Sequence, residues 1–306
     1  MANKTYEIIT NKIIQQLEDA IATGTKFRWV KGWNSGCVPT GNFISYLGND
    51  FRPYRGINQL ILPQGLFLTY NQLLDFQKKY PDRQFKIKQG CKKHTVYFYK
   101  MNDITVKNEE TGKDEVKKIP LLRFYSVFHY EDIEGLDEFV VIPEYQHTLT
   151  ENMEKAEAII EDYCTRDNLQ FEIVEKSDRC FYVPSKHIVN VPPSKQFKSI
   201  NEYYSTVFHE LVHATSKTLG REVKNGFGSE KYSFEELVAE IGSQMLCNVL
   251  GIADSDTDQN SIAYLQSWLK HLKENEPSTI VKASTKAQQA VDLILCGNTI
   301  QTENVA

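Results

Sequence analysis

Apolar residues recur every three to four positions in several segments of the chain, the spacing of one face of an α-helix. The most informative segment opens with Ser199-Ile-Asn-Glu202, a capping-box sequence, and stops at Gly220. Its apolar positions are Tyr203, Tyr204, Val207, Phe208, Leu211, Val212 and Leu219. The pattern predicts a helix over residues 199–219 with one buried face.

Three further segments have the same periodicity. An amphipathic helix is predicted from about Ile8 to Ile21, and another from Thr69 to Lys79. A third covers residues 232–242, where the apolar positions form one stripe: Phe234, Leu237, Val238, Ile241 and, just beyond, Met245. With the helix over residues 199–219, this third segment predicts that the second half of the chain is mainly helical.

Two runs rich in β-branched and aromatic residues, Thr95–Lys100 and Leu121–Phe128, flank the polar stretch Glu109–Glu115. This order predicts an antiparallel hairpin. With the helices, it predicts an α+β protein. Its N-terminal part is an α+β domain with an antiparallel hairpin or sheet, and its C-terminal part is mainly helical with a small β-sheet.

The charged residues are distributed unequally along the 306 residues, a length that suits two domains. Residues 1–130 hold 20 Lys and Arg against 11 Asp and Glu, whereas residues 131–306 hold 15 against 29. We therefore expect a basic domain over residues 1–135, a linker over 136–150 and an acidic domain over 151–306. A basic half of this kind indicates a polyanionic partner.

Composition also narrows the class of protein. The sequence has no run of about 18 apolar residues and its start has no apolar signal region, so neither a membrane partner nor a signal peptide is expected. The six cysteines are scattered without a C-x-x-C pair. They are typical of reduced thiols, and we expect a cytoplasmic protein.

The helix predicted over residues 199–219 carries the candidate chemistry, because residues 209–213 read H-E-x-x-H. Histidines four positions apart share one helix face, so both imidazoles can reach one Zn²⁺ ion, and we expect one ion per chain. His209 and His213 are the predicted ligands, and Glu210 is the predicted general base of a zinc metallopeptidase. The alternative is a surface helix with two ordinary histidines.

A third ligand has to come from elsewhere, because Ser216 and Leu219 stand where a metzincin pattern needs Gly and His. Glu236 and Glu240 share a face of the next helix, which resembles the gluzincin arrangement. That resemblance implies Glu236 as the ligand and Glu240 as the acid that orients a histidine. Glu235 remains a competing ligand, and all three glutamates could instead form a solvated face. The sequence does not choose between Tyr232 and Arg221 as the oxyanion donor.

Aromatic and cationic residues alternate in the basic half, as a surface for single-stranded nucleic acid requires. The candidate contacts are Arg52, Tyr54, Arg55, Lys86, Lys88, Lys92 and Lys93, with Trp29 or Trp33 as stacking platforms. Two alternatives stay open. Arg55 could pair an acid in a tight turn, and the strand aromatics could fill a sheet core: Tyr97, Tyr99, Phe124 and Phe128.

Several strings together resemble the ArdC-type antirestriction family over roughly residues 5–295. They are Pro53-Tyr-Arg-Gly-Ile-Asn58, Tyr125-Ser-Val-Phe-His129, Tyr203-Tyr-Ser-Thr-Val-Phe-His209 and Tyr232-Ser-Phe-Glu-Glu-Leu-Val-Ala-Glu240. The resemblance implies a single-stranded-DNA-binding domain followed by a zincin-like metallopeptidase domain, and protection of entering single-stranded DNA of a mobile element from restriction. The chain departs from the family at Lys88–His94 and Ala214–Ser216.

Two other functions remain possible at this stage. The chain could be a non-catalytic DNA-binding decoy whose zinc site is structural or vestigial. It could also be a peptidase whose basic domain recognises an acidic protein, and a protein substrate or a restriction enzyme is a further possible partner. The metal ligands and the DNA contacts are the features that separate these functions.

Overall fold

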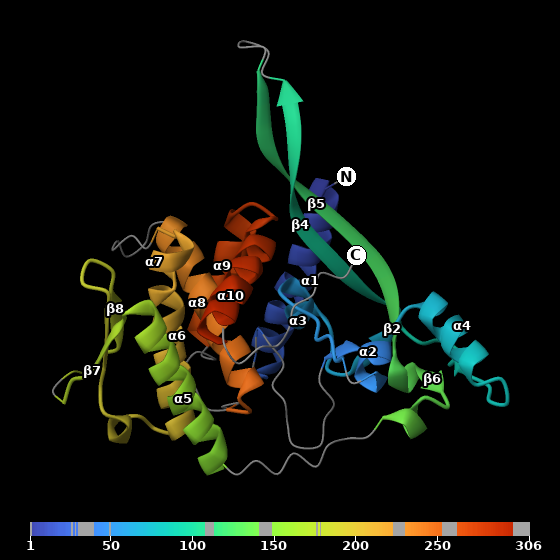
Figure 1. Ribbon diagram of the computed structural model, residues 1–306, viewed down its shortest axis with the longest axis horizontal. Coiled ribbons are helices and arrows are strands. Elements are labelled where there is room, and N and C mark those ends of the chain that lie inside the picture. The colour runs from blue at the N-terminus through green and yellow to red at the C-terminus, as the bar shows by residue number, and fades with distance from the viewer. Residues whose placement is uncertain are drawn as a thin grey trace. The chain divides into compact units, whose positions relative to one another are not determined.

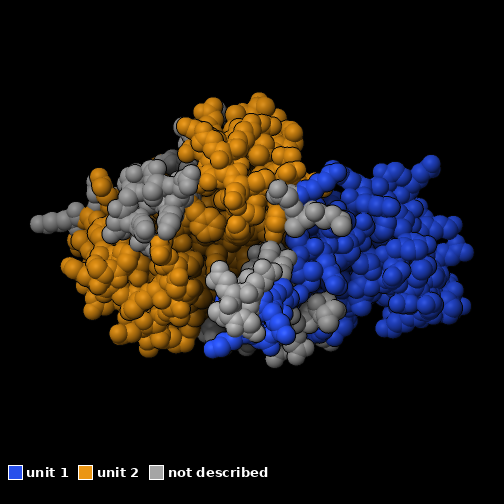
Figure 2. All heavy atoms as spheres, turned by 90° about the horizontal axis from the view of Figure 1, so that it is seen from above, with its two compact units in different colours: residues 1–5, 40–53, 65–141 blue, residues 6–39, 54–64, 142–306 orange. Residues whose placement is uncertain are grey.

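The computed structural model describes most of the chain: residues 2–25, 27, 29, 40–48, 50–107, 113–140, 149–175, 177, 179–222, 230–252 and 262–295. Figure 1 labels its helices and strands, and its contacts divide the chain into two compact units (Figure 2). Unit 1 comprises Met1–Thr5, Thr40–Pro53 and Gly65–Val141. Unit 2 comprises Tyr6–Pro39, Tyr54–Gln64 and Ile142–Ala306.

Unit 1 is built around a four-stranded sheet in the order β1-β2-β5-β4, in which β1 and β2 run parallel and the other neighbours antiparallel. A separate pair, β3 and β6, is antiparallel. The elements of unit 1 are β1 (Gly41–Asn42), α2 (Phe43–Leu47), β2 (Leu66–Leu68), α4 (Tyr70–Lys79), β3 (Lys86–Ile87), β4 (His94–Lys107), β5 (Asp114–His129), η1 (Tyr130–Asp132), β6 (Ile133–Glu134) and η2 (Asp137–Phe139).

The β4–β5 hairpin is longer than the sequence predicts, because both strands extend far beyond their apolar segments. Its base is buried through Val96, Tyr97, Val127 and Phe128. Beyond the base, charged residues enter both strands, and backbone pairing continues to the register Lys107 opposite Asp114. Hydrophobic alternation detects only the part of a strand that covers a core, which is why the rest escaped prediction.

Unit 2 is mainly helical and contains one small sheet in the order β7-β9-β8, with β7 parallel and β8 antiparallel to β9. The first helix, α1 (Ala2–Thr23), has most of its residues here. The other elements are α3 (Ile57–Ile61), α5 (Leu149–Asp167), β7 (Gln170–Ile173), β8 (Phe181–Val183), β9 (Ile188–Val191), η3 (Ser194–Gln196), α6 (Ile200–Ala214), α7 (Ser216–Leu219), α8 (Glu230–Val249), α9 (Ile262–Glu274) and α10 (Thr279–Leu295).

The two units do not follow the expected division near residue 135, because two early segments belong to unit 2. In α1, Thr10 donates a hydrogen bond of 2.6 Å to the carbonyl of Pro277, and Glu18 pairs with Lys273 at 2.7 Å. In the second segment, the backbone N–H of Gly56 donates to Gln288 of α10 at 3.0 Å. Long-range contacts of this kind leave no local trace in the sequence.

The helix predicted over residues 199–219 is present but broken. Ser199 caps α6 by accepting a hydrogen bond from the Glu202 N–H at 3.1 Å, while the Glu202 carboxylate accepts from Lys198 instead of the cap residue. The helix is interrupted at Thr215, and α7 ends at Gly220, whose φ of 64° is left-handed. Residues 209–213 therefore lie within the last turns of α6, before the break at Thr215.

The α+β fold class predicted from the sequence is confirmed, with helices concentrated in unit 2 and the long hairpin in unit 1. Within the predicted linker, η2 belongs to unit 1 and α5 begins at Leu149, while residues 141–148 lie outside the described part. Across the described residues, no helix is long and apolar enough to span a membrane.

Candidate metal centre

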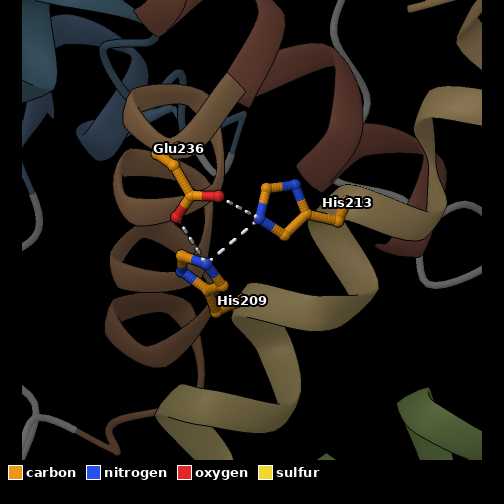
Figure 3. Close-up of side chains that lie close together, drawn as sticks. All are labelled: His209, His213 and Glu236. Carbon is orange, nitrogen blue, oxygen red and sulfur yellow. Dashed lines mark hydrogen bonds and ion pairs between the residues drawn. The ribbon is translucent and has the colours of Figure 1, made fainter. Parts of the chain in front are cut away.

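Three predicted ligand side chains meet between α6 and α8 (Figure 3). The Nε2 atoms of His209 and His213 lie 3.1 Å apart. The two carboxylate oxygens of Glu236 lie 3.4 Å from Nε2 of His209 and 3.3 Å from Nε2 of His213. The histidines come from successive turns of α6 and the glutamate from α8, so the i, i+4 spacing and the packing of two helices together make the cluster.

The cluster has the chemistry and the size of a metal site. Ligand atoms about 2.0–2.1 Å from a tetrahedral zinc ion stand about 3.3 Å from one another. The two Nε2 atoms lie 3.1 Å apart, each has one carboxylate oxygen of Glu236 within 3.4 Å, and one ligand atom from each residue lies within 4.8 Å of the others. Two imidazoles and a carboxylate also leave a fourth position for water or substrate, as catalytic sites require. The residues therefore fit one small divalent cation.

The neighbouring glutamates of α8 contact the opposite sides of the rings. Oε1 of Glu240, the acid predicted to orient a histidine, lies 3.7 Å from Nδ1 of His209, a distance longer than a hydrogen bond. Oε1 of Glu235 lies 3.5 Å from Nδ1 of His213, on the side away from Glu236. The geometry therefore favours Glu236 over Glu235 as the third ligand, and none of the three glutamates belongs to a fully solvated face.

Arg221 lies deep in the same region and is engaged with its surroundings. Its side chain and that of Glu235 are each 5% exposed, and the two are joined by hydrogen bonds of 2.8 and 3.1 Å. Arg221 also donates to the carbonyl of Val212 and to Thr215. These bonds argue against its role as an oxyanion donor. The side chain of the other candidate, Tyr232, lies outside the described residues.

Proton affinity in the cluster follows from its carboxylates. Burial lowers the pKa of both imidazoles, but Glu235 and Glu236 outweigh it and raise the pKa of His213 to about 10. Glu236 likewise raises the pKa of His209. Burial acts to raise the pKa of Glu236, and the two histidines reverse this and lower it. The carboxylates therefore favour the protonated form of His213, and a metal ion has to displace that proton.

Glu210, the predicted general base, is 8% exposed on α6. Its charge contributes to the raised pKa of His209 and of His213, so its carboxylate lies in the field of the cluster. Burial, together with the same carboxylate, raises the pKa of Cys180 to about 12. Cys180, just before β8, therefore lies near Glu210, a proximity that no motif in the sequence indicated.

Several predicted DNA contacts lie in unit 2 and are not available as expected. Trp29 is 1% exposed and packs edge-on against Phe27 and Trp268, so the expectation that it offers a stacking platform is corrected. Tyr54 is 9% exposed, and Arg55 pairs with Asp292 on α10, which favours the structural alternative for this residue. Trp33 lies outside the described residues.

The remaining predicted contacts lie in unit 1. The exposed lysines are Lys86, Lys88, Lys92 and Lys93, of which Lys88 donates to the carbonyl of Glu131 at 2.7 Å. Arg52 is exposed and pairs with Asp50.

The hairpin adds three exposed residues that the sequence analysis did not single out. Phe98 lies opposite Arg123 in the register of β4 and β5, and Tyr125 is two positions further along the same face. Phe98 and Tyr125 are 38% and 42% exposed, and Arg123 is exposed. Phe124, which the core alternative placed inside, is 64% exposed on the other face, whereas Tyr97 and Phe128 are buried as that alternative states.

Comparisons with known proteins match two families to different parts of the chain. Residues 3–128 match the family described as the N-terminal domain of anti-restriction factor ArdC, and residues 154–286 match the zincin-like metallopeptidase family. A DNA primase TraC of Escherichia coli is 32% identical over 95% of this chain, which spans only 27% of that protein.

Two solved structures of the antirestriction ArdC protein from the R388 plasmid resemble the whole chain. The metal-free structure is 31% identical, with a TM-score of 0.63, and the alignment covers 94% of this chain and 96% of that one. The Mn(II)-bound structure is 29% identical with the same coverage and a TM-score of 0.64. On this evidence, the chain belongs to the ArdC family of antirestriction proteins, with a zincin-like domain in its second half.

Proposed function

We propose that this antirestriction protein binds single-stranded DNA through unit 1 and holds one Zn²⁺ ion in unit 2 for peptide hydrolysis. The observation that carries the metal half of the proposal is the cluster of His209, His213 and Glu236, in which one ligand atom from each residue lies within 4.8 Å of the others. Zinc is preferred to manganese for such a site, because nitrogen and oxygen ligands bind Zn²⁺ more tightly than Mn²⁺.

Each residue then has a distinct role. His209, His213 and Glu236 would hold the ion, which when bound polarises a peptide carbonyl and makes a water nucleophile available at neutral pH. The carboxylate of Glu210 accepts the proton of the attacking water and delivers it to the leaving amine. Glu240 orients the ring of His209 through Nδ1.

The DNA half of the proposal is supported by the exposed face of the β4–β5 hairpin. The two rings of Phe98 and Tyr125 lie on one face with Arg123, and Lys92 and Lys93 precede β4. Rings stack on bases and cations follow phosphates, so this combination suits a single strand, whose bases are free to stack.

Replacing Glu210 tests whether hydrolysis matters. The variant Glu210→Gln keeps the size of the side chain and removes its basicity, so it should bind zinc as wild type does and lose protection of an entering single strand against restriction. General-base catalysis contributes about 10²- to 10⁴-fold, so any direct peptidase rate should fall accordingly. Full protection by a zinc-loaded Glu210→Gln protein would contradict the hydrolytic role and support the decoy function.

Binding of a labelled single-stranded oligonucleotide tests the DNA half. Affinity should fall steeply with salt, and Lys92→Ala combined with Lys93→Ala should reduce the log–log slope by about 0.7 for each phosphate that the variant no longer neutralises. Lys78→Ala is the matched control, since Lys78 is exposed on α4 and pairs with Asp75. Failure of the wild-type chain to bind the oligonucleotide at low salt would overturn this half of the proposal.

A further inference from the structure

One metal-site histidine is connected to a buried guanidinium through a carboxylate. Nδ1 of His213 is buried and has no partner at hydrogen-bond geometry among the described residues, and Oε1 of Glu235 lies 3.5 Å from it, at an ion-pair distance. The same Oε1 atom accepts a hydrogen bond of 2.8 Å from Nη2 of Arg221. A single oxygen atom therefore faces both the ring and the guanidinium.

Arg221 is itself held by the helix that carries the histidine. Its Nη2 donates to the carbonyl of Val212 at 2.7 Å, and its Nη1 donates to Thr215 at 2.9 Å. Val212 directly precedes His213, so the chain of interactions from His213 through Glu235 and Arg221 returns to the same helical turn. This arrangement ties the Glu235 carboxylate to the turn of α6 that carries His213.

The Arg221–Glu235 pair also reaches the candidate metal site. Arg221 donates to both carboxylate oxygens of Glu235, at 2.8 Å to Oε1 and 3.1 Å to Oε2, and the Oε1 atom additionally faces the histidine. Here Glu235 lies beside Nδ1, the atom whose partner sets the tautomer and the plane of the imidazole. With Glu236 on the Nε2 side, the ring of His213 is held from both sides.

We propose that Glu235 and Arg221 are positioning residues, which together set the orientation of His213 for metal binding. Glu235 acts on the ring directly, and Arg221 acts by fixing Glu235. The inference rests on the metal site of the proposed function and deepens it. Glu235, a rival ligand on the sequence alone, thus contacts the ligand His213 and not the metal ion.

The experiment compares zinc affinity with metal-free stability in the full chain. The variants are Glu235→Gln, Arg221→Met and the double variant Arg221→Met/Glu235→Met. Zinc dissociation constants are measured by competition with a chromophoric chelator, unfolding midpoints are measured without metal, and the visible spectrum is recorded with Co²⁺. Glu157→Gln is the control. Glu157 lies on α5 and is not one of the residues of the cluster, and it accepts a hydrogen bond of 2.8 Å from Tyr204, which is on the same helix as His213.

Each variant should bind zinc about 10- to 100-fold more weakly than wild type and alter the Co²⁺ spectrum. Arg221→Met should also lower the metal-free unfolding midpoint, because it leaves a buried carboxylate unpaired. The double variant should recover most of that stability, since apolar side chains can replace a buried ion pair, while its zinc affinity stays low. Only a positioning role predicts this separation.

A double variant that binds zinc within twofold of wild type would overturn the inference. If that variant does not fold, Glu235→Gln decides, because it keeps the side-chain volume: wild-type affinity and an unchanged Co²⁺ spectrum would overturn the inference equally. Failure of the proposed metal site gives a different result from failure of this inference, because the wild-type protein itself would then bind no zinc.

Discussion

The metal cluster of unit 2 and the exposed hairpin face of unit 1 are opposite kinds of site. In the cluster, His209 and His213 are 13% and 7% exposed at their side chains, and each approaches a defined atom of a neighbour. On the hairpin, Phe98 and Tyr125 are 38% and 42% exposed and stand in a row set by strand register. Packing between helices fixes the side chains of the cluster, whereas the rings of the hairpin are available to a partner because they are exposed.

This difference predicts different responses to substitution. A buried cluster depends on the mutual position of few atoms, so removing one ligand eliminates most of its function. An exposed strip of rings and cations interacts through many weak, nearly independent groups, so the effect of any single substitution is small and depends on salt. The following predictions test this contrast, beginning with the largest effect.

The largest effect is expected for His209→Ala. Removing one of three ligands should abolish stoichiometric zinc binding, a loss greater than the 10- to 100-fold typical of residues behind the ligands. Metal analysis of the dialysed protein measures it, and DNA binding should remain unchanged. Thr206→Ser on the same helix is the control. Retention of one zinc per chain in His209→Ala would show that the cluster is not the metal site.

The second effect is a pH dependence of the metal site. Although burial opposes it, carboxylate neighbours raise the pKa of His213 from 6.5 to about 10, so protonation stabilises the metal-free fold fully below pH 6.5 and this contribution is lost as the pH rises through 10. Zinc binds the deprotonated ring. The affinity of the site for zinc should therefore fall about tenfold for each pH unit by which the pH is lowered, for each proton displaced.

Thermal unfolding with and without zinc at pH 6 and pH 8 measures this dependence. The increase in unfolding midpoint on adding zinc should be larger at pH 8, whereas the metal-free midpoint should be lower at pH 8 than at pH 6, because the range from pH 6.5 to pH 8 lies between the unfolded and folded pKa values of His213. An increase that is the same at both pH values would mean that no proton leaves the cluster when the ion binds.

A smaller effect is expected on the hairpin. Phe98→Ala and Tyr125→Ala should each weaken binding of a single-stranded oligonucleotide by about 1–3 kcal/mol, because each removes one stacking platform. The salt slope should not change, since no charge is removed. Val116→Ala provides a control on the same hairpin, at a side chain that is 64% exposed but has no ring. Equal weakening by Val116→Ala and Phe98→Ala would contradict base stacking.

The smallest effect concerns Cys180. Burial and the Glu210 carboxylate raise the pKa of its thiol to about 12, so alkylation by iodoacetamide at pH 8 should be slow. Glu210→Gln removes the charge and should accelerate the reaction several-fold, whereas Glu157→Gln should not. Mass spectrometry of the labelled peptide measures the rate. Equal rates in wild type and Glu210→Gln would show that the two side chains do not interact.

Local patterns predicted the parts of the molecule that depend on neighbours in sequence. The Ser199 cap and the Gly220 stop bound α6 and α7, and the i, i+4 spacing puts His209 and His213 on one face. Only the break at Thr215 was missed. The third ligand required a resemblance to known zincins, because Glu235 and Glu236 are adjacent and periodicity alone cannot tell which of them faces α6.

The expected DNA contacts show the opposite outcome. A basic, aromatic stretch of sequence suggested Trp29, Tyr54 and Arg55 as DNA contacts. In the structure Trp29 packs against Trp268, Arg55 pairs with Asp292, and Tyr54 is buried in unit 2. Burial against a distant segment cannot be read from a local pattern. The exposed residues Phe98 and Tyr125 could have been found by following the register of the predicted hairpin, since alternation assigns them to one face.

The sequence by itself determined which side chains the chain offers: a pair of histidines one helical turn apart, a glutamate between them, a helix with acidic residues, and a basic half with strands. Tertiary structure alone decided the partners. It selected Glu236 for the two Nε2 atoms, placed Glu235 between His213 and Arg221, and assigned residues 6–39 and 54–64 to unit 2. The reason is physical: spacing along a helix or strand sets which side chains share a face, but only packing between distant segments sets what that face meets.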